Sequence, residues 1–291
     1  MGKKKIRDNK IVNWSTFNHY YNLIELMYIN RYEWENLPDS VDMRYLELGL
    51  FKKGRMLYFN DEVLGDLCLE MSGDGDISVY REPKKRYAYS AGSGGYTVQR
   101  NMNNSVIIYD NFLRKNNINS ATFFAVRLAE ITRTADVNLH VQKTPYIICC
   151  DEAQKLTMQN MLKDVEENTE RVFGYKGLDV SAINVLKLDA PFIADKLSVE
   201  KMKIWNECLT WMGINNSNTE KRERMVTAEA NSNTECIDFM MQVGLNARLE
   251  AVRKINKMFG TEISVKPSKA IAQMYRIAQY DAGLTGGVED V

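Results

Sequence analysis

Residues 197–229 read LSVEKMKIWNECLTWMGINNSNTEKRERMVTAE, and this stretch decides the fold. It begins with apolar side chains at helical spacing, namely Met202, Trp205, Leu209 and Met212. We expect Ser198 to cap this helix at its start, and Gly213 fits the position just beyond a helix C-terminus. A strongly amphipathic helix therefore runs directly into a polar segment.

The polar segment, residues 215–235, contains only two apolar side chains of any size, Met225 and Val226. A compact domain rarely carries about 20 residues of polar chain, and such a segment is usually functional or disordered. Periodic helices are predicted on both sides of it, the second over 236–259 with Gly260 as its terminator. The segment is therefore a candidate functional loop.

The composition of the whole chain limits the classes of protein that it can be. The 291 residues suffice for one large or two modest domains, and a hydrophobic content of 45% permits a real core. Lysine plus arginine equals aspartate plus glutamate, at 38 each. A protein that coats nucleic acid generally would be strongly basic, so any contact with nucleic acid must come from the placement of charges.

Cysteine usage points to a reducing environment. The five cysteines form no CxxC pair and are Cys68, Cys149, Cys150, Cys208 and Cys236. An odd number with two adjacent members argues against a secreted disulfide framework, so we expect reduced, mostly buried thiols and cytosolic folding. We also expect no signal peptide and no membrane span, because no apolar run reaches 18 residues.

The N-terminal ten residues form a basic arm. Its cations are Lys3, Lys4, Lys5, Arg7 and Lys10, against the single acid Asp8. One reading is a solvated, disordered tail, and the other is an arm that contacts nucleic acid or an acidic partner. The sequence alone leaves both readings open.

Outward from the opening stretch, the pattern alternates between helices and strands. Helices are predicted over 14–36, 119–141 and 268–281, and the 119–141 helix carries Arg133 and Asp136 at a spacing that allows an ion pair. Short alternating or β-branched runs predict strands over 55–59, 77–81, 86–90, 96–100, 105–109 and 261–265. Clusters rich in Gly, Asp and Asn, such as 72–76, are expected to separate the strands between 41 and 110, which suggest a small antiparallel sheet or open barrel. Residues 146–190 suggest a small α/β insert between two long helices, with strands over 146–150, 171–175 and 182–188 and a helix over 157–168.

Catalytic chemistry finds little support in the sequence. The two histidines, His19 and His140, lie on predicted helices without carboxylates at metal-ligand spacing, and no catalytic motif, zinc site or phosphate loop is present. We therefore expect no catalytic residue, metal or cofactor. The remaining signal is positive charge, at Lys187 and Lys196 around DAPF and at Lys221, Arg222 and Arg224 within the polar segment.

Five stretches carry a resemblance to a known family. They are YEWENLP (32–38), QKTP (142–145), LDAPFIADKL (188–197), IWNECLTWMGINNSNTEKRERMVTAE (204–229) and KINKMFG (254–260). In this order and spacing the chain resembles the upper-collar protein of small short-tailed phages with protein-primed DNA synthesis. This protein is also called the head–tail connector or portal. The block at about 183–233 is the most specific part of the match, and the match weakens over 40–118 and beyond 265.

The resemblance implies an α+β portal fold that assembles into a ring of twelve subunits. Long stem helices would surround a channel, a small α/β clip would lie at the narrow end, and a β-rich wing with C-terminal helices would spread inside the capsid. The implied division is a basic arm over 1–10, wing over 11–118, stem helices over 119–142 and 193–213, clip over 143–192, channel loop over 214–235, and wing or crown helices over 236–291.

The resemblance also implies roles for the cations. Lys187 and Lys196 match lysines that line the narrow channel of this family, and Lys221 and Arg222 match a basic pair of the channel loop. Arg224 lies beside that pair and is included with it. The channel must pass DNA in both directions, and phosphate contacts carry no sequence information, so a ring of weak cations suits it.

The implied partners are double-stranded DNA, a packaging ATPase, the major capsid and scaffold proteins and the lower collar or tail proteins. Whether a packaging RNA binds the basic arm stays open, and no membrane partner is expected. The implied place is the portal vertex of the virion, after assembly in the cytoplasm of a bacterial host. Two alternatives compete: another collar or adaptor ring of the tail, and an enzyme such as a nuclease, which DNA cleavage by the pure protein would revive.

Overall fold

The computed structural model describes residues 2–90, 92, 95–143, 146–149, 184–187, 191–215 and 227–269. The chain divides into two compact units, one of residues 1–17 with 127–204 and the other of residues 18–126 with 205–291. Both units are therefore discontinuous in sequence, and the larger one is closed only by segments from both ends of the chain.

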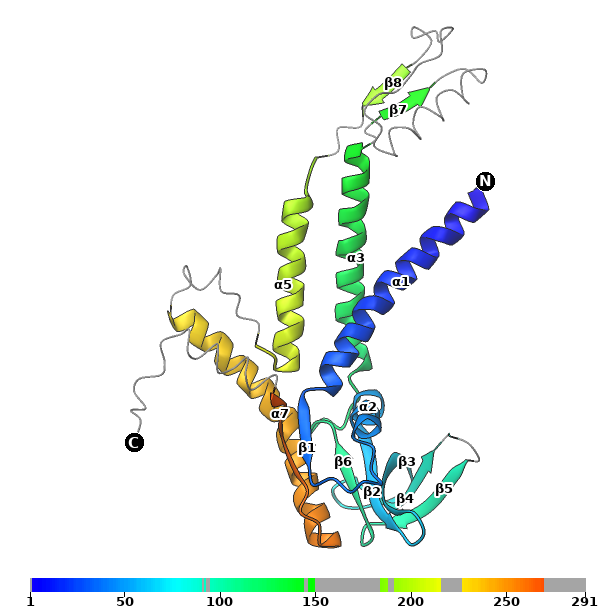
Figure 1. Cartoon of the computed structure of the whole chain (residues 1–291), viewed down its shortest axis with the longest axis vertical. Coiled ribbons are helices and arrows are strands. Elements are labelled where there is room, and N and C mark those ends of the chain that lie inside the picture. Colours follow the sequence, from blue (N-terminus) through cyan, green and yellow to red (C-terminus); the bar gives the residue numbers. More distant parts are fainter. Residues whose placement is uncertain are drawn as a thin grey trace. The chain divides into compact units, whose positions relative to one another are not determined.

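The larger unit is built on a five-stranded antiparallel sheet with the order β5-β4-β3-β2-β6 (Figure 1). Its strands are β2 (Arg55–Asp61), β3 (Gly65–Ile77), β4 (Pro83–Ser90), β5 (Tyr96–Asn101) and β6 (Ser105–Tyr109). Strands that are not neighbours in this order are joined by side chains, because Tyr96 donates to Asp61 at 2.6 Å and Arg86 donates to the Ser105 carbonyl at 2.6 Å. The sheet is therefore curled, as the prediction of an antiparallel sheet or open barrel anticipated.

The core of the curled sheet draws on all five strands. Its fully or nearly buried members are Leu57, Phe59, Met71, Ala88 and Ile107, and Tyr96 and Val98 of β5 pack against them. Strands β2 and β6 are apolar on both faces and have continuous buried runs. Their second face packs on helices: Met56 lies against Gly49 of α2, and the rings of Tyr58 and Phe259 of α7 are 5.3 Å apart. These two strands therefore hold the helices onto the sheet.

Besides residues 118–126 and 205–212, which are parts of helices that continue into the smaller unit, three helices and a strand pair complete the larger unit. They are α2 (Met43–Lys53), α7 (Thr227–Phe259) and the C-terminal part of α1 (Gly2–Ile29), with β1 (Tyr32–Glu35) paired to β9 (Ser264–Pro267). Helix α2 begins where Asp42 accepts from the Tyr45 N–H at 2.6 Å and ends at Gly54, which has a φ of 76°. Strand β1 joins residues that are more than 200 positions apart in the chain, so it ties the N-terminal part to the C-terminal part.

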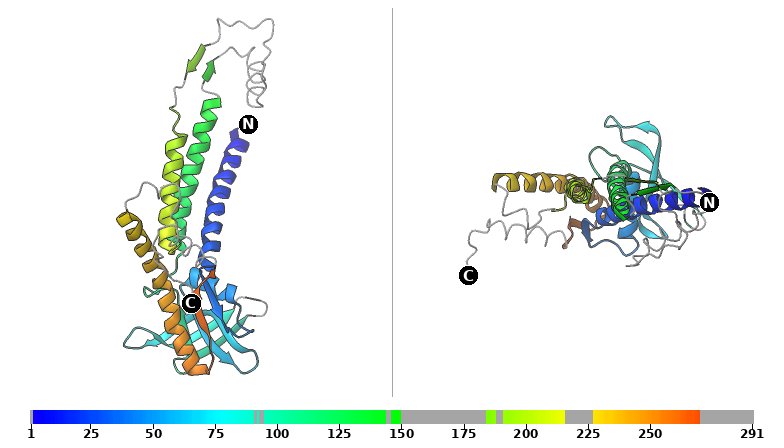
Figure 2. Two further views of the ribbon diagram at one scale, coloured as in Figure 1. Left: turned by 60° about the vertical axis from the view of Figure 1, so that its left-hand side comes forward. Right: turned by 90° about the horizontal axis from the view of Figure 1, so that it is seen from above.

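The smaller unit contains residues 2–17 of α1, parts of two further helices and a short strand pair. The helices are α3 (Ile118–Lys143) and α5 (Ala194–Met212), whose parts in this unit lie side by side and antiparallel (Figure 2). Between them in sequence come β7 (Tyr146–Cys149) and β8 (Asn184–Lys187), which pair antiparallel. The predicted helix over 119–141, the predicted Arg133–Asp136 pair at 2.9 Å and two of the strands predicted in the insert, over 146–150 and 182–188, are confirmed. The strand predicted over 171–175 and the helix predicted over 157–168 lie outside the described residues.

Several predicted elements are wrong at their ends. The helix predicted over 14–36 ends at Ile29, because residues 32–35 pair with β9 instead. It also extends back to Gly2, so the reading of residues 1–10 as a disordered tail is contradicted. Helix α5 begins at Ala194, so Ser198 lies inside the helix and is not its cap. Helix α7 begins at Thr227, so the last nine residues of the polar segment are helical.

Two predictions within the sheet also fail. Residues 78–81 form a turn, and the true strand, β3, runs through the Gly- and Asp-rich residues 72–76 that we expected to separate strands. Those residues are exposed where their side chains are described, so they need little apolar character. Helix α2 was not predicted. Strand β9 begins at Ser264, three residues after the start of the strand that was predicted over 261–265. The predicted helix over 268–281 falls almost wholly outside the described residues.

Gly213 ends α5 at a point where the backbone touches α7. Its φ is 71°, and a Cβ there would lie 2.5 Å from the Met241 nitrogen and 2.7 Å from the Met241 Cα. Only glycine combines this conformation with so close an approach. The end of α5 is thereby fixed against the middle of α7.

We expect Gly213→Ala to lower the free energy of unfolding by clearly more than the ~1 kcal/mol that a left-handed alanine costs on its own, because backbone atoms cannot move aside. Gly75→Ala is the matched control, since Gly75 has a φ of 72° and a Cβ added there would meet nothing within 4 Å. Urea titrations of both variants measure the difference. Equal destabilisation of the two would contradict the close approach.

Candidate functional site

The predicted channel cations lie mostly in the smaller unit or outside the described residues. Lys187 is the last residue of β8 and pairs with Tyr146, and only its backbone is described. Lys196 lies in the first turn of α5 and is exposed. Lys221, Arg222 and Arg224 fall outside the described residues. The structure thus brings Lys187 and Lys196 into one unit and leaves their role in a channel a prediction.

The position of Lys196 is set by a side chain that the sequence analysis did not single out. Asn138 of α3 donates to the Pro191 carbonyl at 2.9 Å and accepts from the Ile193 N–H at 3.1 Å. These two bonds hold the segment before α5 against α3. A mid-helix asparagine is a weak signal of such a contact, because asparagine competes with helix formation by bonding to backbone groups.

The basic arm is helical. Lys3, Lys4, Lys5, Arg7 and Lys10 all lie in the first turns of α1, and positions 3, 7 and 10 have the spacing of one helical face. Their side chains are not described. Further along α1, the Asn13 carbonyl oxygen accepts from Arg133 of α3 at 3.0 Å, which ties this part of the helix to α3 within the smaller unit.

A cluster of hydrogen-bonded polar residues is buried in the larger unit, and Arg248 of α7 lies at its centre. Its side chain is fully buried, and each of its five N–H groups has an acceptor. Nε and Nη2 donate to the two oxygens of Glu47 at 2.9 and 2.6 Å, and Nη2 also donates to Asp110 Oδ1 at 3.0 Å. Nη1 donates to the carbonyls of Asp110 at 3.2 Å and Gly244 at 3.1 Å. This is bidentate recognition with no unused donor.

The two acids carry the network into neighbouring elements. Trp34 of β1 donates to Glu47 Oε1 at 2.8 Å. Asp110 Oδ2 accepts from Tyr28 at the end of α1 at 2.8 Å and from Asn117 before α3 at 2.5 Å. Because α1, α3, β1, α2, β6 and α7 each meet this cluster directly or through one residue, the larger unit is organised around it.

A second buried arginine balances the charge. Arg31 lies 3.5 Å above the ring of Tyr28 and donates to the Met212 carbonyl at the end of α5 at 2.8 Å. Together, Arg31 and Arg248 offset the charges of Glu47 and Asp110. Burial alone would lower the pKa of Arg248, but Glu47 and Asp110 outweigh it and hold that pKa well above its ordinary value. Both arginines therefore keep their charge at any physiological pH.

Tyr28 and Arg248 of this cluster are not suited to proton transfer. Burial raises the pKa of Tyr28 well above its ordinary value, although Arg31 opposes the rise. A tyrosine and an arginine that stay protonated cannot act as acid or base near neutral pH. His19 and His140 are both exposed, and no group of three potential ligands for a metal ion occurs in the part of the chain that the structure describes.

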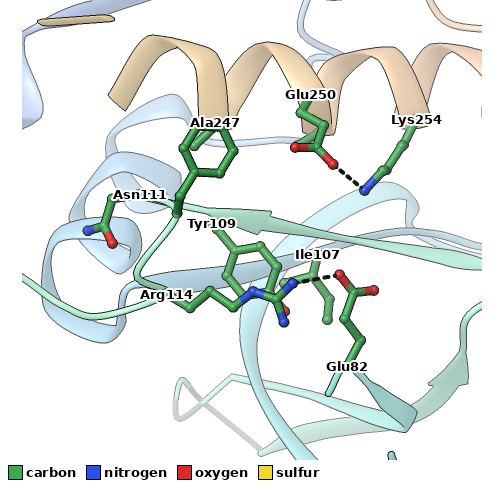
Figure 3. A pocket seen from close by; sticks show the side chains of 10 residues that line it. Glu82, Ile107, Tyr109, Asn111, Arg114, Ala247, Glu250 and Lys254 are labelled. Atoms are coloured by element: carbon green, nitrogen blue, oxygen red, sulfur yellow. Dashed lines mark hydrogen bonds and ion pairs between the residues drawn. The ribbon is translucent and has the colours of Figure 1, made fainter. Parts of the chain in front are cut away.

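A small cavity lies between β6, the loop after it and α7 (Figure 3). Its volume is about 90 Å³, and ion pairs between Arg114 and Glu82 at 3.1 Å and between Lys254 and Glu250 at 2.8 Å stand at its edge. Ligand pockets usually measure roughly 300–1,000 Å³, so this space is too small for a cofactor.

The sequence expectations for the cysteines and for the apolar face of α5 are confirmed only in part. Cys68 and Cys208 are buried, in line with the expectation of mostly buried thiols, and burial raises the pKa of the Cys208 thiol to about 12. Cys236 is exposed, and the side chains of Cys149 and Cys150 lie outside what the structure describes. Met202, placed on the apolar face of α5, is 42% exposed, while Leu209 and Met212 are buried. Among the described helices, none is long and apolar enough to span a membrane.

Comparison with known proteins identifies the family. A family model described as Phage Connector (GP10) matches residues 2–272 of the 291. The chain belongs to the phage connector family. It is therefore a head–tail connector of the portal type and a component of the virion, in a family whose role is structural rather than catalytic.

Solved structures of low identity show likeness to the connector over most of its length. A chain in the structure of the portal and tail of native bacteriophage P68 is 13% identical, with a TM-score of 0.49 and coverage of 98% of both chains. An HK97 family phage portal protein from Corynebacterium diphtheriae is 9% identical, with a TM-score of 0.46 and coverage of 89% of this chain and 93% of that one. A chain of a native gene transfer agent virion is 12% identical, with a TM-score of 0.43, and the match covers 96% and 87%.

Arg248→Met is expected to lower the free energy of unfolding by about 3–5 kcal/mol, because it leaves two buried carboxylates without their cation. The matched control is Lys254→Met on the same helix, which removes an exposed pair and should cost at most about 0.5 kcal/mol. Chemical denaturation measures both. The triple variant Arg248→Met, Glu47→Gln, Asp110→Asn should recover part of the loss, and an Arg248→Met variant as stable as the control would refute the role of the cluster.

Proposed function

We propose that this connector forms a closed ring of twelve subunits at one vertex of the capsid. The ring would be the channel for DNA packaging and ejection and the attachment site for motor and tail. The single observation that carries the proposal is the connector-family match over residues 2–272. Long helices α3 and α5 joined through a short strand pair suit the stem and clip of such a ring.

The channel itself would be lined by Lys187, Lys196, Lys221, Arg222 and Arg224. One cation per subunit becomes a belt of charge in a ring, so DNA meets nearly equivalent phosphate contacts at any rotation. Because the chain has zero net charge, the attraction of such belts for DNA would stay weak enough for the DNA to slide. Support for this proposal comes from the exposure of Lys196 at the start of α5.

The partners proposed are double-stranded DNA, a separate packaging ATPase, the capsid and scaffold proteins, and the lower collar and tail proteins. The protein would have no catalytic activity of its own, and assembly would take place in the cytoplasm of a bacterial host. The basic first turns of α1 offer a helical face to a packaging RNA or to an acidic partner.

The oligomer is the first property to measure. Native mass spectrometry and negative-stain imaging of the purified protein should show a closed ring of twelve with a central hole. A protein that stays monomeric with and without capsid and scaffold protein would refute the ring.

The cations within 216–226 would act as a brake that holds packaged DNA. A deletion is a poor test, because α5 ends against Met241 and α7 begins at Thr227, roughly 20 Å further along that helix. After a deletion of 216–226, only residues 214 and 215 would remain to connect Gly213 to Thr227. They could not cover that distance, since each residue spans at most about 3.6 Å. Substitution removes the charge and keeps the length.

Lys221→Ser, Arg222→Ser, Arg224→Ser should let packaging start but allow DNA to slip back, so capsids would retain shorter genomes. The matched control, Glu220→Ser with Glu223→Ser, changes the same segment without removing a cation and should retain full genomes. Pulsed-field gels of DNA from purified capsids measure the length. Full genomes in the triple variant would contradict the brake.

A further inference from the structure

Two turns at one end of the curled sheet present large apolar side chains to solvent. In the turn Ser78–Arg81 the exposed pair is Val79 at 91% and Tyr80 at 80%, and in the turn Asn111–Arg114 it is Phe112 at 61% and Leu113 at 79%. The central positions of such turns normally hold small or polar residues. Four large apolar side chains there form a surface of the kind that marks an interaction site.

The two turns have the same construction. In each, the N–H of the arginine donates to the carbonyl of the first residue at 2.9 Å. Arg81 has a φ of 60° and Arg114 a φ of 58°, a region that non-glycine residues rarely occupy. Backbone of this kind persists where the surrounding structure holds it, often at functional positions. We call these two segments the basic turn pair.

Ion pairing holds the two turns together and leaves the pair basic. Glu82, directly after the first turn, accepts from Arg114 of the second turn at 3.1 Å (Figure 3). Exposed cations lie in or next to the two turns, namely Arg81, Lys84, Lys85 and Lys115, and they outnumber the two acids at the end of β3, Asp74 and Asp76. A surface that covers the basic turn pair must therefore be apolar and carry acidic groups at its rim.

The same chain offers such a surface at the other end of β3. The turn before β3, Asp61–Gly65, exposes Val63 at 89% and Leu64 at 52%. Its conformation is fixed, because the N–H groups of both residues donate to Asp61 Oδ1 at 3.1 and 3.2 Å. We call this segment the acidic turn.

Acidic side chains surround this turn. Glu62 lies within it, Asp66 follows it, and the Ser40 hydroxyl donates to the Asp66 carbonyl at 2.6 Å, which brings the exposed Asp39 into the neighbourhood. Arg100 pairs with Asp61 at 3.3 Å and leaves the other three acids as the surplus charge. The acidic turn thus complements the basic turn pair in charge and matches it in apolar character.

The two surfaces cannot meet within one molecule. Successive hairpin turns lie at opposite ends of the strand between them, and β3 is 13 residues long. We propose that copies of this chain associate head to tail, with the basic turn pair of one copy against the acidic turn of the next. Contacts of this heterologous kind generate rings when the rotation closes. The inference deepens the proposed ring by naming a surface that joins its subunits, and it rests on that proposal.

Two variants, each blocking one end, test the direction of the contact. Val79→Gln with Tyr80→Gln removes the apolar part of the basic turn pair, and Val63→Gln with Leu64→Gln removes that of the acidic turn. Each variant alone should associate roughly tenfold or more weakly than the unchanged chain. A mixture of the two should form dimers and stop there, because only one intact contact is possible. Native mass spectrometry reads the masses, and sedimentation gives the dissociation constants.

The controls separate folding from association. All four residues are exposed, so circular dichroism and the unfolding midpoint should match those of the unchanged chain. The conservative variant Val79→Ile, Tyr80→Phe keeps the apolar surface and should still form rings. Exchanging charges at both ends, with Glu62→Lys and Asp66→Lys against Lys84→Glu and Lys85→Glu in one chain, should restore association that either exchange alone weakens.

The outcomes also separate this inference from the proposed function. If the unchanged chain forms rings and both Gln variants form them with the same dissociation constant, the head-to-tail contact is wrong while the ring stands. If the unchanged chain forms no ring with or without capsid and scaffold protein, both proposals fail. Dimers that stop at two in each Gln variant alone would point to a symmetric contact elsewhere and would also overturn the inference.

Discussion

Arg248 and its two carboxylates are the constraint on which the larger unit depends. A buried guanidinium is costly unless every N–H is satisfied, and here Glu47, Asp110 and two carbonyls satisfy all five. These acceptors come from α2, from the end of β6 and from α7 itself. The helices can therefore occupy only one arrangement around the sheet, because a shift of any one of them would leave a buried charge without a partner.

The helical layout could be predicted because it depends on local patterns. The apolar spacing of 119–141 and 236–259, the glycines at 213 and 260, and the alternation of 86–90 and 96–100 are local signals, and each corresponds to an element of the structure. The family resemblance, carried by blocks such as 204–229, agrees with the family match.

The remaining features depend on partners that are distant in sequence. Residues 32–35 look helical in isolation and become a strand because Ser264–Pro267 lies beside them. Glu47, Asp110 and Arg248 are ordinary charged residues in the sequence, and only the fold brings the arginine within 3.0 Å of both acids. The proposal that the cations of the polar segment line a channel came from the resemblance and stays a prediction, since a polar segment has no pattern that specifies its position.

The pairing of Asp110 with Arg248 has a consequence for synthesis on the ribosome. Roughly 140 residues separate the two, and translation at about 5–20 residues per second takes on the order of ten seconds to supply the arginine. Until then Glu47 and Asp110 are better hydrated than buried, so the nascent sheet cannot close with its helices. Strand β9 emerges later still. The larger unit thus completes only after Ser264–Pro267 has been made, so its first strand, β1, waits for a partner more than 200 residues later in the chain.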